Sequence, residues 1–171
     1  VGRFYTRHVT GYVVGHFDRP VRMYRGENMA GIVSDESRHD PDRGFVGGYY
    51  LELVGFGPIT YGTIMESVHR EGPPLAAAME AYDRSAAMWI CGEDLPMYDN
   101  RVTLDASVTD AAGEPVPHIH LDEHPNDAAM RRHGWERGTA IFAAAGATSI
   151  DTSFGLPSGH SHGTARMSDD P

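Results

Sequence analysis

Apolar and polar residues alternate along much of the chain, and this pattern predicts a series of β-strands. The alternation is clearest over residues 10–18, where Tyr12, Val14 and His16 share one side, and Arg19-Pro20 closes the segment. Further strands are expected at residues 21–24, 47–56, 88–91, 100–105, 116–121 and 147–151. The charge-dense segment 34–44 has no apolar period and predicts a loop.

Two helices are predicted between these strands, whereas residues 55–58 indicate only a turn. Pro73 and Pro74 suit a first helical turn, and alanine-rich sequence follows to residue 82. The second helix starts at 125–127, where Asn126 or Asp127 is expected to cap the free amides, and it ends at Gly146. Its face toward the sheet is expected to consist of residues three or four apart: Met130, Gly134, Gly138, Ile141 and Ala145, flanked by Trp135 and Phe142.

The order of these elements predicts the fold class. Asp110 and Gly113 lie in a segment typical of a hairpin loop, so strands 100–105 and 116–121 should be antiparallel neighbours. Strands in hairpin connection, with helices available to cover them, predict an α+β domain. We expect a mainly antiparallel sheet with the helices packed on one face.

Length, charge and composition indicate a single domain and argue against nucleic-acid-binding and membrane-spanning proteins. A length of 171 residues favours one domain, and the net charge of −10 argues against binding to nucleic acid. The single cysteine, Cys91, rules out an intramolecular disulfide and is expected to be a buried apolar residue. No apolar run approaches the roughly 18 residues of a membrane span. We expect a soluble protein, in the cytoplasm in preference to the periplasm.

A loop of small residues near the C-terminus, residues 157–167, carries the best candidates for chemistry. It contains His160 and His162, and an imidazole can act as a general base because its ordinary pKa lies near neutrality. Gly159 and Gly163 allow close approach of another molecule to the backbone. A polar surface loop without function is the alternative interpretation.

Two other groups of residues have the chemistry of a functional site. His118 and His120 share one face of a strand, so they could bind a metal ion with Asp122 or His124, although the same face suits the solvent side of a hairpin. Ser158 and Ser161 flank His160 as possible nucleophiles, but no Gly-x-Ser-x-Gly elbow occurs. The sequence also lacks a Gly-x-Gly-x-x-Gly dinucleotide turn.

The segment 160–171, His-Ser-His-Gly-Thr-Ala-Arg-Met-Ser-Asp-Asp-Pro, resembles the His-x-x-Gly-Thr-x-Arg-Met-Gly-x-Asp-Pro signature of the glucose-methanol-choline (GMC) flavin oxidoreductases. Ser168 replaces the usual glycine of that signature. Segments 93–96 and 100–105, then Asp110, and segments 113–116, 124–127 and 144–147 are similar to the bacterial sugar-acid and polyol dehydrogenase branch in the same order. The opening Val1-Gly2-Arg3 with His8 is similar to the family's Val-Gly-Arg-x-x-x-x-His segment.

The resemblance implies that residues 1–171 form one substrate-binding domain of a larger FAD-dependent enzyme, whose own flavin domain is its missing partner. It implies oxidation of the CH–OH group of a small alcohol, polyol or sugar acid, with His160 accepting the hydroxyl proton. His162 is a neighbour or an alternative base, and Ser161, Gly163 and Thr164 are expected near substrate or cofactor. We expect this chain alone neither to retain FAD tightly nor to turn over. A non-catalytic or metal-binding module that uses His118, His120 and His124 is the competing hypothesis.

Overall fold

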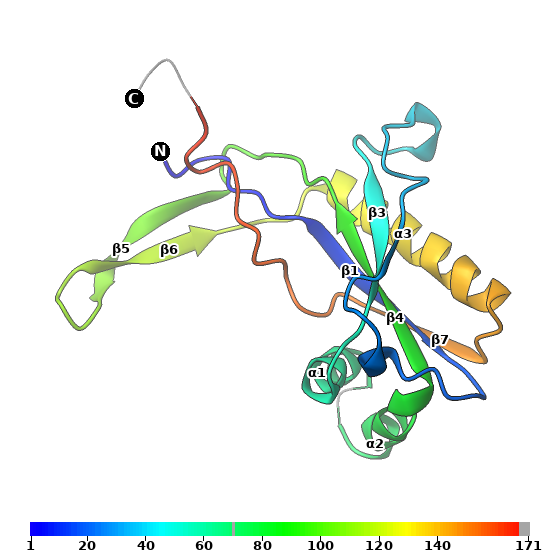
Figure 1. Cartoon of the computed structure of the whole chain (residues 1–171). Coiled ribbons are helices and arrows are strands. Elements are labelled where there is room, and N and C mark those ends of the chain that lie inside the picture. The colour runs from blue at the N-terminus through cyan, green and yellow to red at the C-terminus, as the bar shows by residue number, and fades with distance from the viewer. Residues whose placement is uncertain (70, 168–171) are drawn as a thin grey trace.

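The computed structural model of the chain describes residues 1–69 and 71–167. A five-stranded sheet has the order β2-β3-β4-β1-β7, and every pair of neighbours is antiparallel. Its strands are β1 (Val9–His16), β2 (Gly31–Val33), β3 (Tyr49–Val54), β4 (Ser85–Gly92) and β7 (Ser149–Ser153). β5 (Arg101–Thr109) and β6 (Pro115–His120) form a separate hairpin that extends away from the sheet (Figure 1). The predicted α+β class, antiparallel sheet and hairpin are confirmed.

α3 (Pro125–Ala144) covers one face of the sheet (Figure 1). The central strand β1 is buried along its whole length, and its Val9 and Val13 face this helix together with Ile90 of β4. A Cβ atom at Gly138 would lie 2.7 Å from Cγ2 of Val13, so a glycine is needed for the helix to lie this close to the strand. Met130, Gly134 and Gly138 face the sheet as predicted, and Ile141 packs against the same core beside the buried Phe142. Ala145 is exposed, contrary to the prediction.

The opposite face is covered at one end by α1 (Pro58–His69) and α2 (Pro73–Glu80). The helices therefore lie on both faces, and the expectation that they share one face is corrected. α1 was not predicted, because Gly55–Pro58 were interpreted only as a turn. Its buried face nevertheless has a helical period: Tyr61, Ile64, Met65 and the partly buried Val68.

Three local expectations differ from the structure. Residues 21–24 form no strand, because Arg22 has a positive φ of 56° and the chain turns into a short 3₁₀ helix, Met23–Arg25. The edge strand β2 was not predicted, since its three residues are too few to show a pattern. The cap of α3 is His124, whose side chain accepts a hydrogen bond from the Asn126 amide, so neither Asn126 nor Asp127 has the predicted role.

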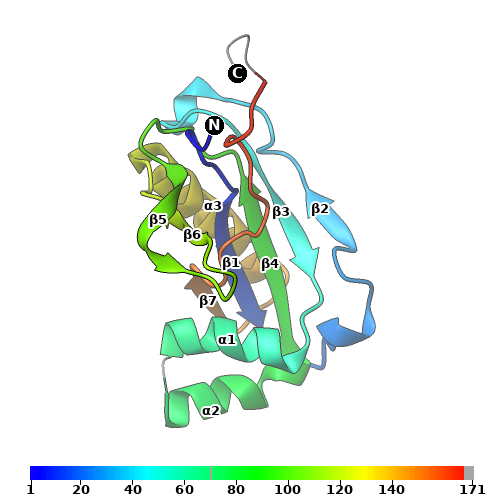
Figure 2. The same cartoon turned by 90° about the vertical axis from the view of Figure 1, so that its left-hand side faces the viewer.

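The two ends of the described chain run together and place the predicted loop. Thr6 and His162 form an antiparallel bridge, and the Gly2 amide donates to the Thr164 carbonyl. Gly163 has a φ of 86°, and its Cα lies so close to the Phe4 carbonyl that a Cβ atom would overlap it. After β7 the chain crosses the sheet on the face opposite α3 (Figure 2). Within the described residues, no helix is both long and apolar enough to cross a bilayer.

Candidate functional site

Three histidines gather where the crossing C-terminal segment passes the start of β1. Nε2 of His8 lies 3.0 Å from Nδ1 of His160, and the two ring centroids are 5.0 Å apart at 89°. The His162 ring centroid is also 5.0 Å from that of His8. The structure thus brings both predicted histidines, His160 and His162, to one place and adds His8.

The contact between His8 and His160 determines which ring nitrogens can donate and which can accept a proton. Burial lowers the pKa of His8, and the neighbouring His162 and His160 lower it further, so the neutral form of His8 is favoured. A neutral His8 can accept a hydrogen bond at Nε2 from the Nδ1–H of His160. That arrangement leaves the lone pair of His160 on Nε2, the nitrogen that faces away from His8, and makes this atom a base.

Backbone and side-chain contacts hold the loop in this position. Oγ of Ser158 accepts a hydrogen bond from the backbone amide of His160 at 3.0 Å. Ser161 shares a hydrogen bond of 3.1 Å with the hydroxyl of the buried Tyr5. Nδ1 of His162 lies 3.5 Å from Oγ1 of Thr6, across the backbone bridge between the same two residues. The N-terminal segment therefore holds the loop in position through its contacts with Ser161 and His162.

His160 borders a cavity of about 250 Å³ on the face opposite α3. Trp89 of β4 lines this cavity. The centroid of the Trp89 ring lies 6.2 Å from that of His160, in an edge-on arrangement. The other walls come from strands, from the segment before β2 and from the loop: Tyr12, Asn28, Met29, Val54, Phe56 and residues 156–159. A second cavity of about 280 Å³ borders His8 and is lined by Tyr50 and Cys91. Cys91 is buried, as predicted.

One buried carboxylate lies on the same sheet face, and the sequence analysis missed it. Glu52 of β3 pairs with Trp89 of β4 and is only 7% exposed. Burial raises the pKa of Glu52, and the nearby His160 opposes this shift. A lone glutamate in an otherwise apolar and aromatic strand was the available signal, because such a residue is seldom buried without a partner or a role.

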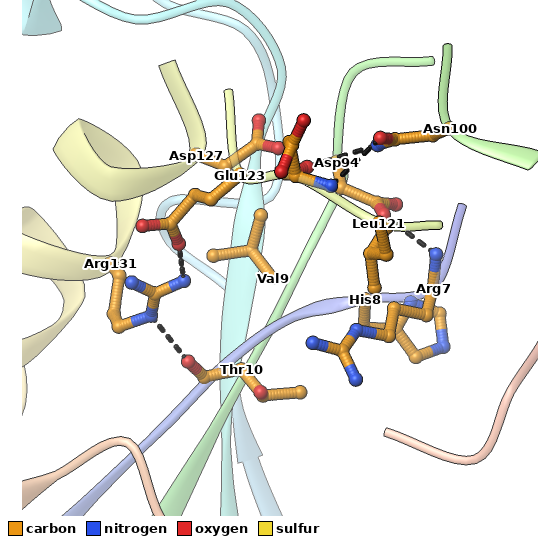
Figure 3. Close-up of a pocket in the computed structure, with 11 residues that line it drawn as sticks. Arg7, His8, Val9, Thr10, Asp94, Asn100, Leu121, Glu123, Asp127 and Arg131 are labelled. Atoms are coloured by element: carbon orange, nitrogen blue, oxygen red, sulfur yellow. Dashed lines mark hydrogen bonds and ion pairs between the residues drawn. The ribbon is translucent and has the colours of Figure 1, made fainter. Parts of the chain in front are cut away.

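The polar junction beside His8 is structural (Figure 3). Nε of Arg131 donates to the Thr10 carbonyl at 2.6 Å, and its other end pairs with Glu123. Oδ2 of Asp94 accepts from the Arg7 amide at 2.6 Å, which joins the N-terminal segment to the chain that follows β4. These charged side chains already bind protein partners, so we assign the junction a structural role. It attaches the hairpin to the sheet and holds the segment that carries His8.

The two competing constellations gain no support. His124 is occupied as the cap of α3, and His120 pairs with Asp122 at 3.2 Å. In the part of the chain that the structure describes, no three His, Cys, Asp or Glu side chains are placed to hold a metal ion. His118, His120 and His124 are therefore not arranged as a metal site in this structure. The seryl hydroxyls of 158 and 161 contact a backbone amide and Tyr5, as described above, and not the ring of His160.

The signature segment 160–171 lies only partly within the described residues. Ser168, Asp169, Asp170 and Pro171 lie outside the described residues. Gly163 and Thr164 lie within them and hold the loop to the N-terminal segment. Their predicted proximity to a substrate or cofactor stays a prediction.

Comparison with known proteins gives an informative likeness. No family model matches the chain. The chain is 30% identical over 182 residues to the 2-methyl-1,2-propanediol dehydrogenase of Mycolicibacterium austroafricanum. That alignment covers 100% of this chain but 33% of the other protein, so the chain spans about a third of the length of this curated relative. The whole chain is thus similar to one part of a protein named as a diol dehydrogenase.

Proposed function

We propose that this chain is the substrate-binding part of an FAD-dependent alcohol oxidoreductase of the GMC type, with His160 as the proton acceptor. The observation that carries the proposal is the hydrogen bond between His8 and His160 at the edge of the cavity. It holds one nitrogen of His160 and leaves the other available to a ligand. The likeness to a diol dehydrogenase supports the same reaction class.

The chain's own residues account for the movement of the proton. A substrate hydroxyl in the cavity donates its proton to Nε2 of His160 while the C–H bond is broken, so a protonated carbonyl is never formed. His160 becomes a cation in this step. The lone pair on Nε2 of His8 accepts the hydrogen bond of the resulting imidazolium and stabilises it. Trp89 packs edge-on against both rings and restricts their orientation.

The exposed edge of the loop fits a planar cofactor brought by another part of a longer protein. His160 and His162 are exposed, and a Cβ atom placed on Gly159 would meet nothing within 4 Å. Ser161, Gly163 and Thr164 would border such a ring. FAD, when bound, supplies the acceptor for the hydride.

The test is His160→Ala in the complete flavoenzyme that contains this chain, assayed by dye-linked oxidation of a panel of alcohols and polyols. Removal of the base should lower the turnover by about 10²–10⁴-fold with the fold intact. His118→Ala is the matched control, because it removes an exposed histidine of the hairpin. Turnover by His160→Ala equal to that of the wild type would refute the proposal, and zinc-dependent activity lost in His118→Ala would favour a metal site.

A further inference from the structure

We infer that Glu52 and Trp89 form a recognition site for a second hydroxyl group of the substrate, beside His160, which selects neutral diols and short polyols. The inference rests on the proposed function and specifies its substrate class. It starts from two buried polar atoms. Oε2 of Glu52 and Nε1 of Trp89 are closed off from solvent and have no hydrogen-bond partner among the described residues.

The two unpartnered atoms belong to neighbouring side chains. Glu52 and Trp89 are directly opposite each other on β3 and β4, so their side chains start about 5 Å apart on the same face. Both side chains are more than nine-tenths buried. A buried polar atom without a partner destabilises the protein, and a charged group does so more strongly. Two such atoms on facing side chains therefore favour a bound group that satisfies both.

Their chemistry specifies that group. A carboxylate oxygen only accepts hydrogen bonds, and an indole N–H only donates one. A hydroxyl can donate to Glu52 and accept from Trp89 at the same time. An ammonium group has no acceptor for the indole, and a substrate carboxylate has no donor for Glu52 and would repel it. The pair thus favours a neutral alcohol over a sugar acid.

The location suits a second hydroxyl next to the reacting one. Along β3, Tyr50 lines one cavity and Val54 lines the other, and Glu52 lies between them on the same face. Trp89 lines the cavity that also contains His160. At about 250 Å³, this cavity is smaller than the roughly 300–1,000 Å³ of pockets for drug-sized ligands, so it suits a short molecule.

The first experiment measures binding without oxidation. Pinacol has two hydroxyl groups, and its carbinol carbons carry no hydrogen, so it can bind but cannot be oxidised. Calorimetry on the complete flavoenzyme should show that pinacol binds about 10- to 100-fold more tightly than its analogue with one hydroxyl. Glu52→Leu should abolish this preference and leave binding of the analogue unchanged. Trp89→Phe should reduce it, and Glu66→Gln, on the exposed side of α1, should leave it intact.

The second experiment measures the ratio of kcat/KM for propylene glycol to that for n-propanol. Glu52→Leu should lower this ratio by about 10- to 100-fold with little change for n-propanol. Equal loss for both substrates, or a preference for pinacol that persists in Glu52→Leu, would overturn the inference. Tighter binding of ethanolamine than of propylene glycol, lost in Glu52→Leu, would overturn it in favour of a cation site.

The two proposals can fail separately. If the wild type prefers pinacol through Glu52 but no alcohol reduces its flavin, the recognition site stands and the proposed function is wrong. If alcohols are oxidised but Glu52→Leu changes no ratio, the function stands and the recognition site is wrong. Thermal unfolding confirms that each variant is folded, and Glu52→Met, which keeps the length of the side chain but has no strong hydrogen-bond acceptor, replaces Glu52→Leu if that variant does not fold.

Discussion

Two histidine clusters lie at opposite ends of β1, and they differ in what the histidines bind. At the far end, Nδ1 of His16 contacts Oγ of Ser85 at 2.9 Å, and its Nε2 contacts Oδ2 of Asp151 at 2.9 Å. His69 of α1 reaches the same carboxylate oxygen at 3.1 Å. At the near end, the His160 ring makes one hydrogen bond among the described residues, between its Nδ1 and Nε2 of His8.

The comparison shows that identical imidazole side chains acquire different roles from their hydrogen-bond partners. Both nitrogens of His16 are used, and Ser85 is completely buried with its hydroxyl donating to the Ala81 carbonyl. This cluster has the residue types of a hydrolytic triad but no accessible nucleophile, so it ties β1, β7 and α1 together. His160 has a free nitrogen at a cavity and can exchange a proton with a ligand.

The largest effect on stability is expected from Asp151→Asn at the far cluster. The change removes the charge that accepts hydrogen bonds from His16 and His69, and we expect the free energy of unfolding to fall by about 1–3 kcal/mol. Turnover per folded molecule should not change. Chemical denaturation of the complete enzyme measures this, with the exposed Asp35→Asn as control. Loss of turnover without loss of stability would reverse the roles assigned to the two clusters.

The pH dependence of unfolding sharpens the same prediction. Hydrogen bonds from His16 and then His69 hold the pKa of Asp151 below its ordinary value, although burial opposes them. The stability from this lowered pKa is therefore fully present above the unfolded value of about 3.9, and is lost as the pH falls through the folded value. The wild type should lose this part of its stability in acid, and Asp151→Asn should lack that loss.

A smaller effect is expected at the near cluster from His8→Leu. Loss of the acceptor for Nδ1–H of His160 should slow turnover about tenfold and change its pH profile, because the orientation and tautomer of His160 are no longer fixed. In His8→Gln, the amide oxygen can replace Nε2 as acceptor and should restore most of the rate. Equal rates in the wild type and in His8→Leu would show that His8 only packs.

Much of the fold follows from local pattern. The strands β1, β3, β4 and β7, the hairpin, α2 and α3 all have apolar periods or turn residues that the sequence displays. The missed helix α1 also shows a period, from Tyr61 to Val68, and could have been found. Its position on the second face could not, because that depends on how aromatic side chains such as Tyr12 and Trp89 pack across strands distant in sequence.

The sequence predicts the two loop histidines of the candidate site but not their partners. His160 and His162 stand out as imidazoles among small residues, but the partner of His160 is His8, 152 positions earlier, and no spacing rule connects them. Glu52 carries no motif, and its significance appears only when the sheet places it opposite Trp89 with an unpaired oxygen. Contacts between distant strands decide which polar residues are left without partners.

The most direct test of the central claim is the pH dependence of flavin reduction by a saturating diol, followed anaerobically in the complete enzyme and in His160→Asn. If His160 accepts the proton, the wild-type rate rises with pH to a plateau, because a base must be unprotonated to accept a proton. In His160→Asn the rate should be about 10²–10⁴-fold lower and this rise should disappear. A variant that keeps both the wild-type rate and the same rise would show that another group accepts the proton.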